Sequence, residues 1–581
     1  MKRMRPLARH HSIFFLIMRR LRAPLILLIT IMAISVLGLT LTPGAEENGQ
    51  VQYLSFFHAL YFMSYTATTI GFGEIPYAFS DQQRLWVVFC IYMSVVGWAY
   101  TLGTVFALLS DRSLQQAIAM QRFVRAVRRL REPFYLVCGY GETGRLICNA
   151  LDRMGLRSVV VEIDETKVGE IELHSFAADV PALCADASNP ETLQYAGLTH
   201  PHCAGVIALT NQDPTNLAIA IAARLLAPKL PALCRAEHRE TSANMASFGT
   251  RHIINPFERF GETLALALHA PAASQLLNWL TGLPGTPVER HRSPPRGHWI
   301  VCGHGRFGRW MVDAMDAESL PVTIVDRNEL PDGSHRWIQG DGTGAEALRE
   351  AGVLQATGIV AGTSSDVDNL SIAVTARELN PDLFVILRQN HYANQPLFDA
   401  FESDITVLPS EIIAHECLAI LGTPLLVPFL REIRRHDEVW CSEQLERLTG
   451  RLSWKVPEIW SERINLRRAP ALYRRLMRGE TVTLDALMRS TAQREDKLDC
   501  EALYLDRDDD DHLLMPARDT PLRAGDELLL AGTRRARDAF ALNIANEHTL
   551  EYLLTGEDLP GGWIWDRLSR RRRAKLKPQL R

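Results

Sequence analysis

Two long apolar stretches near the amino terminus constrain the fold of this 581-residue chain more than any other feature. Ala23 to Leu41 is apolar apart from Thr30, Ser35 and Thr40, and Leu85 to Leu109 contains no charged residue. At a rise of about 1.5 Å per residue, each stretch nearly or fully spans a hydrocarbon core of about 30 Å as a helix. Because a bilayer offers no water to backbone groups, both are predicted to be transmembrane helices.

The segment between these stretches is aromatic and ends in a glycine-containing motif. Tyr53 to Ala67 is too short to span a bilayer and predicts a re-entrant helix, whose carboxyl end carries partial negative charge. The motif that follows reads Thr68, Thr69, Ile70, Gly71, Phe72, Gly73. The two glycines can adopt positive φ, so that successive carbonyls point the same way. Rings of such carbonyls replace the hydration shell of K⁺.

This motif resembles the TVGYGD signature of tetrameric potassium channels, with Ile70 for Val, Phe72 for Tyr and Glu74 for Asp. The resemblance implies a filter that conducts K⁺ and is closed by four copies of the chain in a lipid bilayer. Phe72 lacks the hydroxyl that braces such a filter from behind. A weakly selective cation channel therefore stays open as an alternative.

Basic residues flank the apolar stretches on one side of the predicted membrane. They precede the first stretch and follow the second, whereas 42–83 contains no Lys or Arg. Because basic residues stay on the cytoplasmic side, both termini are expected in the cytoplasm. The resemblance implies the inner membrane of a prokaryotic cell.

Two glycines interrupt the second apolar stretch. Gly97 and Gly103 are candidate gating hinges, because glycine weakens a helix locally, and Gly97 is preferred. Close packing of a neighbouring helix is the alternative reading of both.

An internal repeat follows the membrane part. Each copy has an apolar strand, a G-x-G-x-x-G turn, an acidic residue 18 positions after the third glycine, and a further Asp. In the first copy these are Gly139, Tyr140, Gly141, Glu142, Thr143, Gly144, Glu162 and Asp186. In the second they are Gly303, His304, Gly305, Arg306, Phe307, Gly308, Asp326 and Asp341. Alternating strands and helices with this fingerprint predict doubly wound parallel sheets that bind a dinucleotide at the glycine turn.

The two copies resemble RCK domains, the regulatory modules of potassium channels that are related to bacterial TrkA subunits. The resemblance implies NAD(H), ADP or ATP as a regulatory ligand and a gating ring of eight units in a homotetramer. A carboxylate at the end of the second strand favours NAD or an adenine nucleotide over NADP. A purely structural role of the glycine turns stays open, as does the choice of copy.

The predicted fold class is multi-domain, with an α-helical membrane pore, two α/β Rossmann-like RCK domains and a small α+β carboxyl-terminal subdomain. The predicted parts are a cytoplasmic amino terminus (1–22), a pore domain (23–110), a gating linker (111–132), the first RCK domain (133–282), a linker (283–297), the second RCK domain (298–424), the subdomain (425–545) and a basic tail (546–581). Within the pore domain they are the first transmembrane helix (23–41), the pore helix (53–67), the filter (68–74) and the second transmembrane helix (85–109).

Other sites and classes receive less support from the sequence. Ten cysteines without a CxxC pair suggest neither zinc nor a disulfide framework. The acidic run that includes Asp508, Asp509, Asp510 and Asp511 is a weak Ca²⁺ candidate, since its spacing fits no EF-hand. No enzymatic activity and no nucleic-acid partner are expected. A membrane-anchored NAD-dependent oxidoreductase is the remote alternative, which would need a substrate domain with a placed acid or base.

Overall fold

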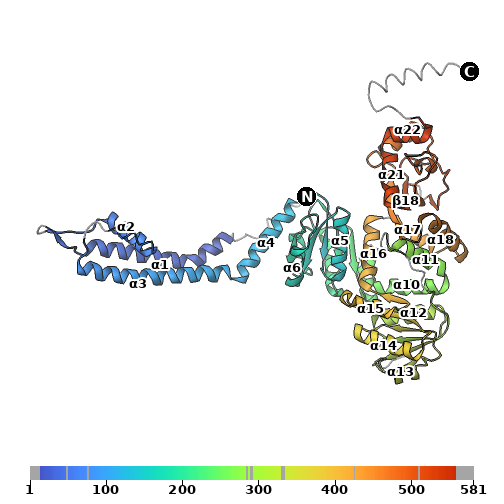
Figure 1. Ribbon diagram of the computed structural model, residues 1–581, viewed down its shortest axis with the longest axis horizontal. Helices are drawn as coiled ribbons and strands as arrows, with labels where there is room; N and C mark the ends of the chain where they lie inside the picture. The colour runs from blue at the N-terminus through green and yellow to red at the C-terminus, as the bar shows by residue number, and fades with distance from the viewer. Residues whose placement is uncertain are drawn as a thin grey trace, which may run out of the picture. The chain divides into compact units, whose positions relative to one another are not determined.

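The computed structural model describes residues 13–47, 50–74, 78–250, 252–282, 285–287, 292–328, 334–423, 425–507 and 511–557. The chain divides into two compact units, 1–129 and 130–581, which are described separately. Figure 1 shows the elements of each unit.

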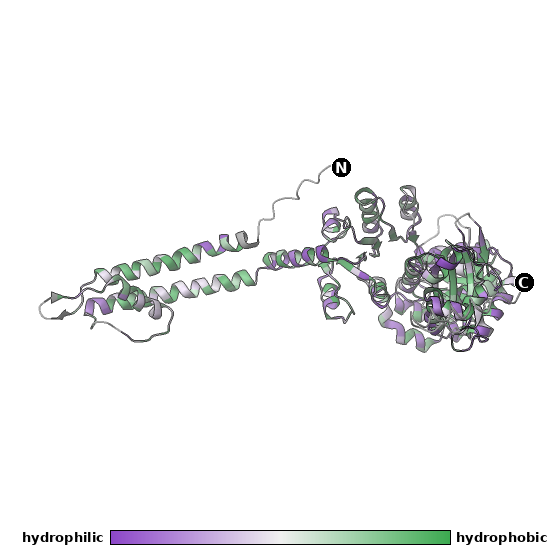
Figure 2. Ribbon diagram, turned by 90° about the horizontal axis from the view of Figure 1, so that it is seen from above, coloured by the Kyte–Doolittle hydropathy of each residue, from purple (hydrophilic) through white to green (hydrophobic). Residues whose placement is uncertain are grey.

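The first unit is a helical hairpin with a short helix beside it. Its elements are α1 (Ile13–Leu41), β1 (Glu46–Glu47), β2 (Gln50–Val51), α2 (Phe56–Ala67), α3 (Asp81–Leu109) and α4 (Arg112–Arg129). Helices α1 and α3 lie side by side, and α2 packs against both (Figure 1). Among the described residues, two helices are long and apolar enough to cross a membrane, Ile17–Leu41 and Asp81–Leu109. Both are coloured mostly as hydrophobic along their length (Figure 2).

Both long helices begin earlier than predicted, α3 because of a local contact and α1 in line with its residue types. Ser80 and Gln83 form a reciprocal capping box, so α3 starts at Asp81 rather than at Leu85. Helix α1 continues without a break from Ile13 into the apolar stretch, although 1–22 was expected to precede the membrane helix. The Arg residues at its start are good helix formers, which favours this extension.

The first repeat is a six-stranded parallel sheet with strand order β5-β4-β3-β6-β7-β8. Its elements are β3 (Phe134–Cys138), α5 (Glu142–Arg153), β4 (Arg157–Glu162), α6 (Glu165–Leu173), β5 (Ala182–Cys184), α7 (Pro190–Tyr195), β6 (Cys203–Ala208), α8 (Asp213–Leu226), β7 (Ala232–Arg235), α9 (Arg239–Ser247), β8 (His252–Ile254), α10 (Pro256–His269) and α11 (Pro271–Thr281).

The second repeat has the matching order β11-β10-β9-β12-β13-β14, again fully parallel. Its elements are β9 (Trp299–Cys302), α12 (Arg306–Ala317), β10 (Val322–Asp326), β11 (Arg336–Gln339), α13 (Ala345–Glu350), β12 (Gly358–Ala361), α14 (Asp366–Leu379), β13 (Phe384–Arg388), the 3₁₀ turn η1 (Tyr392–Asn394), α15 (Gln395–Phe401), β14 (Ile405–Val407), α16 (Pro409–Gly422) and α17 (Leu426–Ile433).

The two repeats exchange the helices that follow their last strands. Helix α10 leaves the first sheet and packs against α12 of the second repeat, while α16 leaves the second sheet and packs against α5 of the first. Phe257 of α10 is buried with Phe307 in the core of the second repeat. In turn, Ile413 and Cys417 of α16 are buried in the core of the first. Neither hydrophobic core is therefore complete without the other repeat.

The carboxyl-terminal part has a four-stranded sheet of order β15-β18-β16-β17, paired antiparallel throughout. Its elements are α18 (Glu438–Leu452), β15 (Glu458–Arg463), α19 (Pro470–Leu476), α20 (Leu484–Leu487), β16 (Cys500–Asp506), β17 (His512–Leu514), β18 (Glu527–Gly532), α21 (Arg534–Ala545) and α22 (Glu547–Thr555).

Helix α22 corrects the predicted boundary between this subdomain and the basic tail at 546. Asn546 caps the helix by accepting from the N–H groups of His548 and Thr549. Leu550 and Leu553 are buried, and Leu550 belongs to the core of the subdomain. Apolar spacing of three residues after a good cap is the local signal for this helix.

Candidate functional site

The predicted filter has a backbone that alternates in handedness. Thr69, Gly71 and Gly73 have φ values of +62°, +66° and +74°, whereas Ile70 and Phe72 between them are not in this region. Alternation of this kind turns successive carbonyls toward one side of the chain. It is the conformation that a carbonyl-lined ion path requires.

The pore helix α2 holds both ends of the filter. At the start, the N–H groups of Ile70 and Gly71 donate to the Tyr65 carbonyl at 3.0 and 3.2 Å. At the end, the Tyr65 hydroxyl donates to the Glu74 carbonyl at 2.5 Å, and the Tyr61 hydroxyl donates to the Glu74 carboxylate at 3.1 Å. The Phe72 ring lies edge to face with Tyr65, with 6.0 Å between ring centroids. Two tyrosine hydroxyls of the pore helix thus contact Glu74, the residue directly after Gly73.

The two hinge candidates lie in different surroundings within α3. A Cβ at Gly97 would come 2.6 Å from Ile31 Cδ1 of α1, so glycine allows the two helices to approach closely there. The Thr101 hydroxyl donates to the Gly97 carbonyl at 2.8 Å, a contact that often bends helices. A Cβ at Gly103 would meet nothing within 4 Å. Gating movement at either residue stays a prediction.

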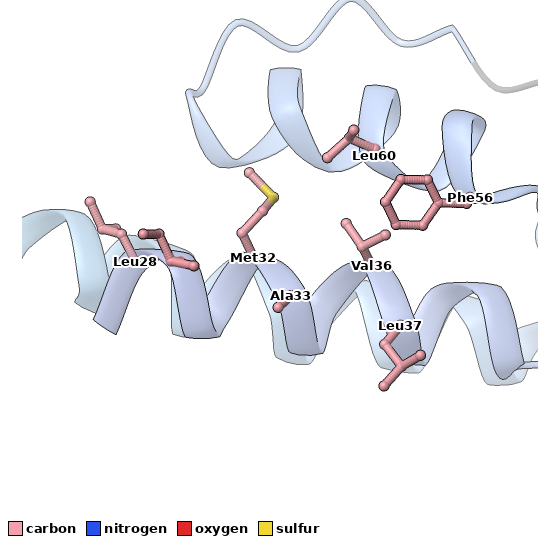
Figure 3. A pocket seen from close by; sticks show the side chains of 8 residues that line it. Leu28, Met32, Ala33, Val36, Leu37, Phe56 and Leu60 are labelled. Atoms are coloured by element: carbon pink, nitrogen blue, oxygen red, sulfur yellow. The ribbon is translucent and has the colours of Figure 1, made fainter. Parts of the chain in front are cut away.

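An apolar groove of about 670 Å³ lies between parts of α1 and the pore helix. Figure 3 shows Met32 and Val36 of α1 pointing toward Leu60 and Phe56 of α2. Phe56 is 68% exposed in the single chain. A surface this apolar is suited to lipid or to another copy of the chain rather than to water.

The first and third glycines of both turns are required by the fold itself. A Cβ at Gly144 or Gly308 would lie 2.1 or 1.9 Å from the carbonyl oxygen of Gly139 or Gly303. The middle glycines, Gly141 and Gly305, differ, because a Cβ there would meet nothing within 4 Å. The space in front of each middle glycine is open, as the approach of a pyrophosphate would require.

In the first repeat, the predicted ligand residues are engaged by the protein. Glu162 is buried and accepts from the N–H groups of Tyr140, Ile163 and Asp164. Glu142, the first residue of α5, accepts from the Tyr392 N–H of the second repeat at 2.9 Å. Tyr140 and Thr143 are buried, and Asp186 accepts from the Ser188 N–H at 2.8 Å. A carboxylate therefore occupies the start of the helix where a phosphate would bind.

In the second repeat, the corresponding residues line a cavity of about 570 Å³ at the carboxyl ends of the strands. It includes Gly303, Gly305, Arg306, Asp326 and Asp341 among the predicted residues. Phe307 and Gly308 are instead buried beneath the turn. The His304 N–H donates to Asp326 at 2.6 Å, which fixes the turn against β10.

Four arginines line this cavity, against three aspartates. The arginines are Arg306, Arg309, Arg327 and Arg388, and the aspartates are Asp326, Asp341 and Asp368. Arg388, the last residue of β13, is 9% exposed, and burial lowers the pKa of its guanidinium to about 10, so it is charged at neutral pH. Arg388 was not among the residues predicted from the sequence, and it lies more than 60 residues beyond the acid of β10. Its position at the end of a buried strand of the second half-sheet was the available signal.

The weak calcium candidates receive no support from the described residues. Asp508, Asp509 and Asp510 lie outside the described residues. Asp511 pairs with Arg507 at 3.4 Å. No group of three or more His, Cys, Asp or Glu side chains suited to a metal ion occurs in the part of the chain that the structure describes.

Family models match both parts of the chain. The model described as an ion channel matches residues 25–111, and the model described as the TrkA-N domain matches residues 135–256 and again 299–409. The domain types predicted from the sequence are therefore confirmed.

Several archaeal proteins are similar to parts of the chain. A probable potassium channel protein 2 of Methanocaldococcus jannaschii is 22% identical over 36% of this chain and 59% of its own length. Potassium channel protein 1 of the same organism is 26% identical over 24% of this chain and 44% of its own length. An uncharacterized protein of Methanothermus fervidus is 28% identical over 42% of this chain and 37% of its own length. The chain thus covers less than two thirds of each.

Solved structures of the GsuK channel are also similar. One is 18% identical to this chain and has a TM-score of 0.44. The match covers 90% of this chain and 99% of the solved chain. Another, described as bound to NAD, is 17% identical, covers 92% of this chain and 99% of its own, and has a TM-score of 0.42.

Proposed function

We propose that this chain, which joins an ion channel domain to two TrkA-N domains, forms a potassium-selective channel whose opening is controlled by a nucleotide. The observation that carries the ion path is the alternating backbone of Thr69, Gly71 and Gly73. Each chain contributes one such loop, so a closed ring of carbonyls needs four copies. The apolar surfaces of α1 and α3 fit a bilayer as surroundings, and the basic residues at both cytoplasmic ends fit an inner-membrane orientation.

The second repeat is the proposed nucleotide site. Its cavity presents four arginines beside the open middle glycine, Gly305, and a helix amino terminus that carries no carboxylate. An anionic pyrophosphate is favoured by that charge and by the α12 amino terminus. Asp326 lies where a ribose hydroxyl would bind, so NAD(H), ADP and ATP are the ligand class.

Nucleotide binding opens or closes the pore only if one arrangement of the repeats binds the ligand more tightly. The segment 111–132, helical over Arg112–Arg129, is the connection that carries such a change to α3. In the proposed tetramer, eight repeats form a ring that acts on the four inner helices.

Single-channel recording from the purified protein in bilayers with a K⁺/Na⁺ gradient tests this proposal. We expect a reversal potential near that of K⁺ and an open probability that changes with NAD⁺, NADH, ADP or ATP on the side of the soluble domains. Ca²⁺ is added separately, since the acidic run at 508–511 is the weaker ligand candidate. An open probability that does not change with any nucleotide would contradict the gating proposal. A reversal potential near zero under the gradient would favour the weakly selective channel.

Removing the Tyr65 hydroxyl tests whether the channel is selective for K⁺ or only weakly selective. Tyr65→Phe removes the bond to the Glu74 carbonyl while keeping the ring against Phe72, so we expect a lower K⁺/Na⁺ permeability ratio with currents preserved. Tyr61→Phe, which removes only a side-chain contact to Glu74, is the matched control with a smaller change. NADH oxidation by the same preparation, without any current, would favour the oxidoreductase alternative.

A further inference from the structure

Arg388 is a buried cation that forms no direct ion pair among the described residues, although the charges of Glu237 and Asp366 act on it from nearby. Its Nε atom is buried without a hydrogen-bond partner, and its Nη1 group reaches only the Gly362 carbonyl at 3.5 Å. The guanidinium lies 4.8 and 5.6 Å from the ring centroids of Phe257 and Phe307. A buried charge is expensive unless an anion or a set of hydrogen bonds compensates it. Because Arg388 lines the cavity, its missing partner has room to bind there.

In the first repeat, the charge of the matching arginine is compensated by a carboxylate. Arg235, the last residue of β7, pairs with Glu237 and donates to Asn211 at 2.7 Å. Its Nε atom is unpartnered like that of Arg388, so the two arginines differ in the ion pair and not at Nε. Asn390 stands in the second repeat where Glu237 stands in the first, so Arg388 has no such carboxylate. The contrast indicates that an external anion fills this role in the second repeat.

Glu237 also reaches across to the second repeat. It is 5% exposed and forms a second ion pair, with Arg306 at the start of α12. Arg306 lines the cavity, and its side chain is 44% exposed. The cation best placed to meet a phosphate at the glycine turn is therefore held by a carboxylate of the other repeat.

We propose that Arg388 is a phosphate-binding residue of the second repeat and that Glu237 is an internal competitor, which a bound phosphate displaces from Arg306. This inference rests on the proposed role of the second repeat as the nucleotide site. Arg235 stays paired with Glu237 after the exchange, so no carboxylate is left buried alone. Since the Arg306–Glu237 pair joins the two repeats, ligand binding weakens that contact, and by linkage the contact weakens ligand binding.

Asp313 of α12 provides a matched control because it is another carboxylate that joins the repeats. It pairs with Arg239 of α9, and neither residue lines the cavity. Asp313→Asn therefore loosens an ion pair between the repeats and leaves the charge of the cavity-lining residues unchanged. Glu237→Gln loosens a contact and also releases Arg306.

Isothermal titration calorimetry of the purified full-length protein with ADP, and separately with inorganic pyrophosphate, tests the exchange. We expect Glu237→Gln to bind both probes about tenfold more tightly than wild type, and Asp313→Asn to bind them about as wild type does. Arg388→Gln is expected to bind both roughly tenfold or more weakly, with Arg388→Lys in between. Size-exclusion chromatography and thermal unfolding confirm that each variant is folded.

Two results would overturn the inference while leaving nucleotide binding intact. One is equal tightening in Glu237→Gln and Asp313→Asn, which would assign the effect to a looser contact between repeats. The other is wild-type affinity in a folded Arg388→Gln or Arg388→Lys. If the wild-type protein binds none of ADP, NAD⁺ and pyrophosphate, that result contradicts the proposed nucleotide site and this inference together.

Discussion

The two repeats share a scaffold and differ in the charge at their glycine turns. Their sheets have the same strand order, and their first and third glycines meet the same steric demand. At the first position of the following helix, however, the first repeat has Glu142 and the second has Arg306. At the first turn Glu142 accepts from a backbone N–H of the other repeat, whereas the second turn faces a cavity lined by four arginines and three aspartates.

This difference indicates that the G-x-G-x-x-G fingerprint specifies the conformation of the turn and does not by itself specify a bound ligand. The glycines that build the turn are present in both copies. What decides binding is whether the helix amino terminus is left free for phosphate and whether a cation faces it. By that criterion our proposal assigns the nucleotide to the second copy, although both copies match the same domain model.

The largest expected effect is a loss of stability, and it tests a buried asparagine that the two repeats have in common. Asn216 and Asn369 are fully buried, and each accepts two bonds from Thr210 or Thr363 and donates to two carbonyls. Replacing either by Leu leaves several buried groups unsatisfied, so we expect roughly 4 kcal/mol of destabilisation at either site. Denaturant unfolding with hydrogen exchange localises the loss to the altered repeat.

Equal losses would confirm that the shared scaffold is equivalent in the two copies. A loss of stability in only one of the two variants would show that the copies already differ in their cores, and the comparison of turns would then be incomplete. Asn328→Leu, at an exposed position with a 3.4 Å side-chain contact to Asp326, is the control with little expected effect.

The middle glycines test how the repeats differ. Because a Cβ at either position meets nothing within 4 Å, Gly305→Ala and Gly141→Ala should each change stability by about 0.5 kcal/mol or less. Gly305→Ala places a methyl group where a pyrophosphate approaches, so we expect roughly tenfold or greater loss of ADP affinity. Gly141→Ala should leave the affinity unchanged, as measured by calorimetry on the full-length protein. Equal losses in both variants would mean that both turns bind nucleotide.

Much of this organisation was predictable from local sequence. The two apolar stretches predicted α1 and α3, and the repeated glycine turns predicted two parallel sheets, because both signals depend on nearby residues. The exchange of α10 and α16 was not predictable, since an apolar helix face does not say which repeat it covers. Arg388 and Glu237 were missed for the same reason, because their importance arises from a contact between segments far apart in sequence. Whether the predicted filter, hinge and nucleotide residues act as proposed stays a prediction.

The smallest expected effect concerns the exchanged helices, which belong equally to both repeats. Arg259 of α10 pairs with Glu416 of α16 at 2.9 Å, yet burial raises the pKa of Glu416 more than Arg259 lowers it. The folded chain therefore holds the Glu416 proton more tightly than the unfolded chain does. Its contribution to stability is present below pH 4.5 and is lost as the pH rises through the raised pKa.

Glu416→Gln should thus remove this part of the pH dependence and change the free energy of unfolding at pH 7 by no more than about 1 kcal/mol, because a partly exposed pair contributes little. Thermal unfolding at pH 5 and pH 7 measures the change. ADP affinity should not change, because the pair lies on the exchanged helices and not among the residues of the cavity. A large change in affinity would show that the exchanged helices, and not only the Glu237–Arg306 contact, distinguish the two turns.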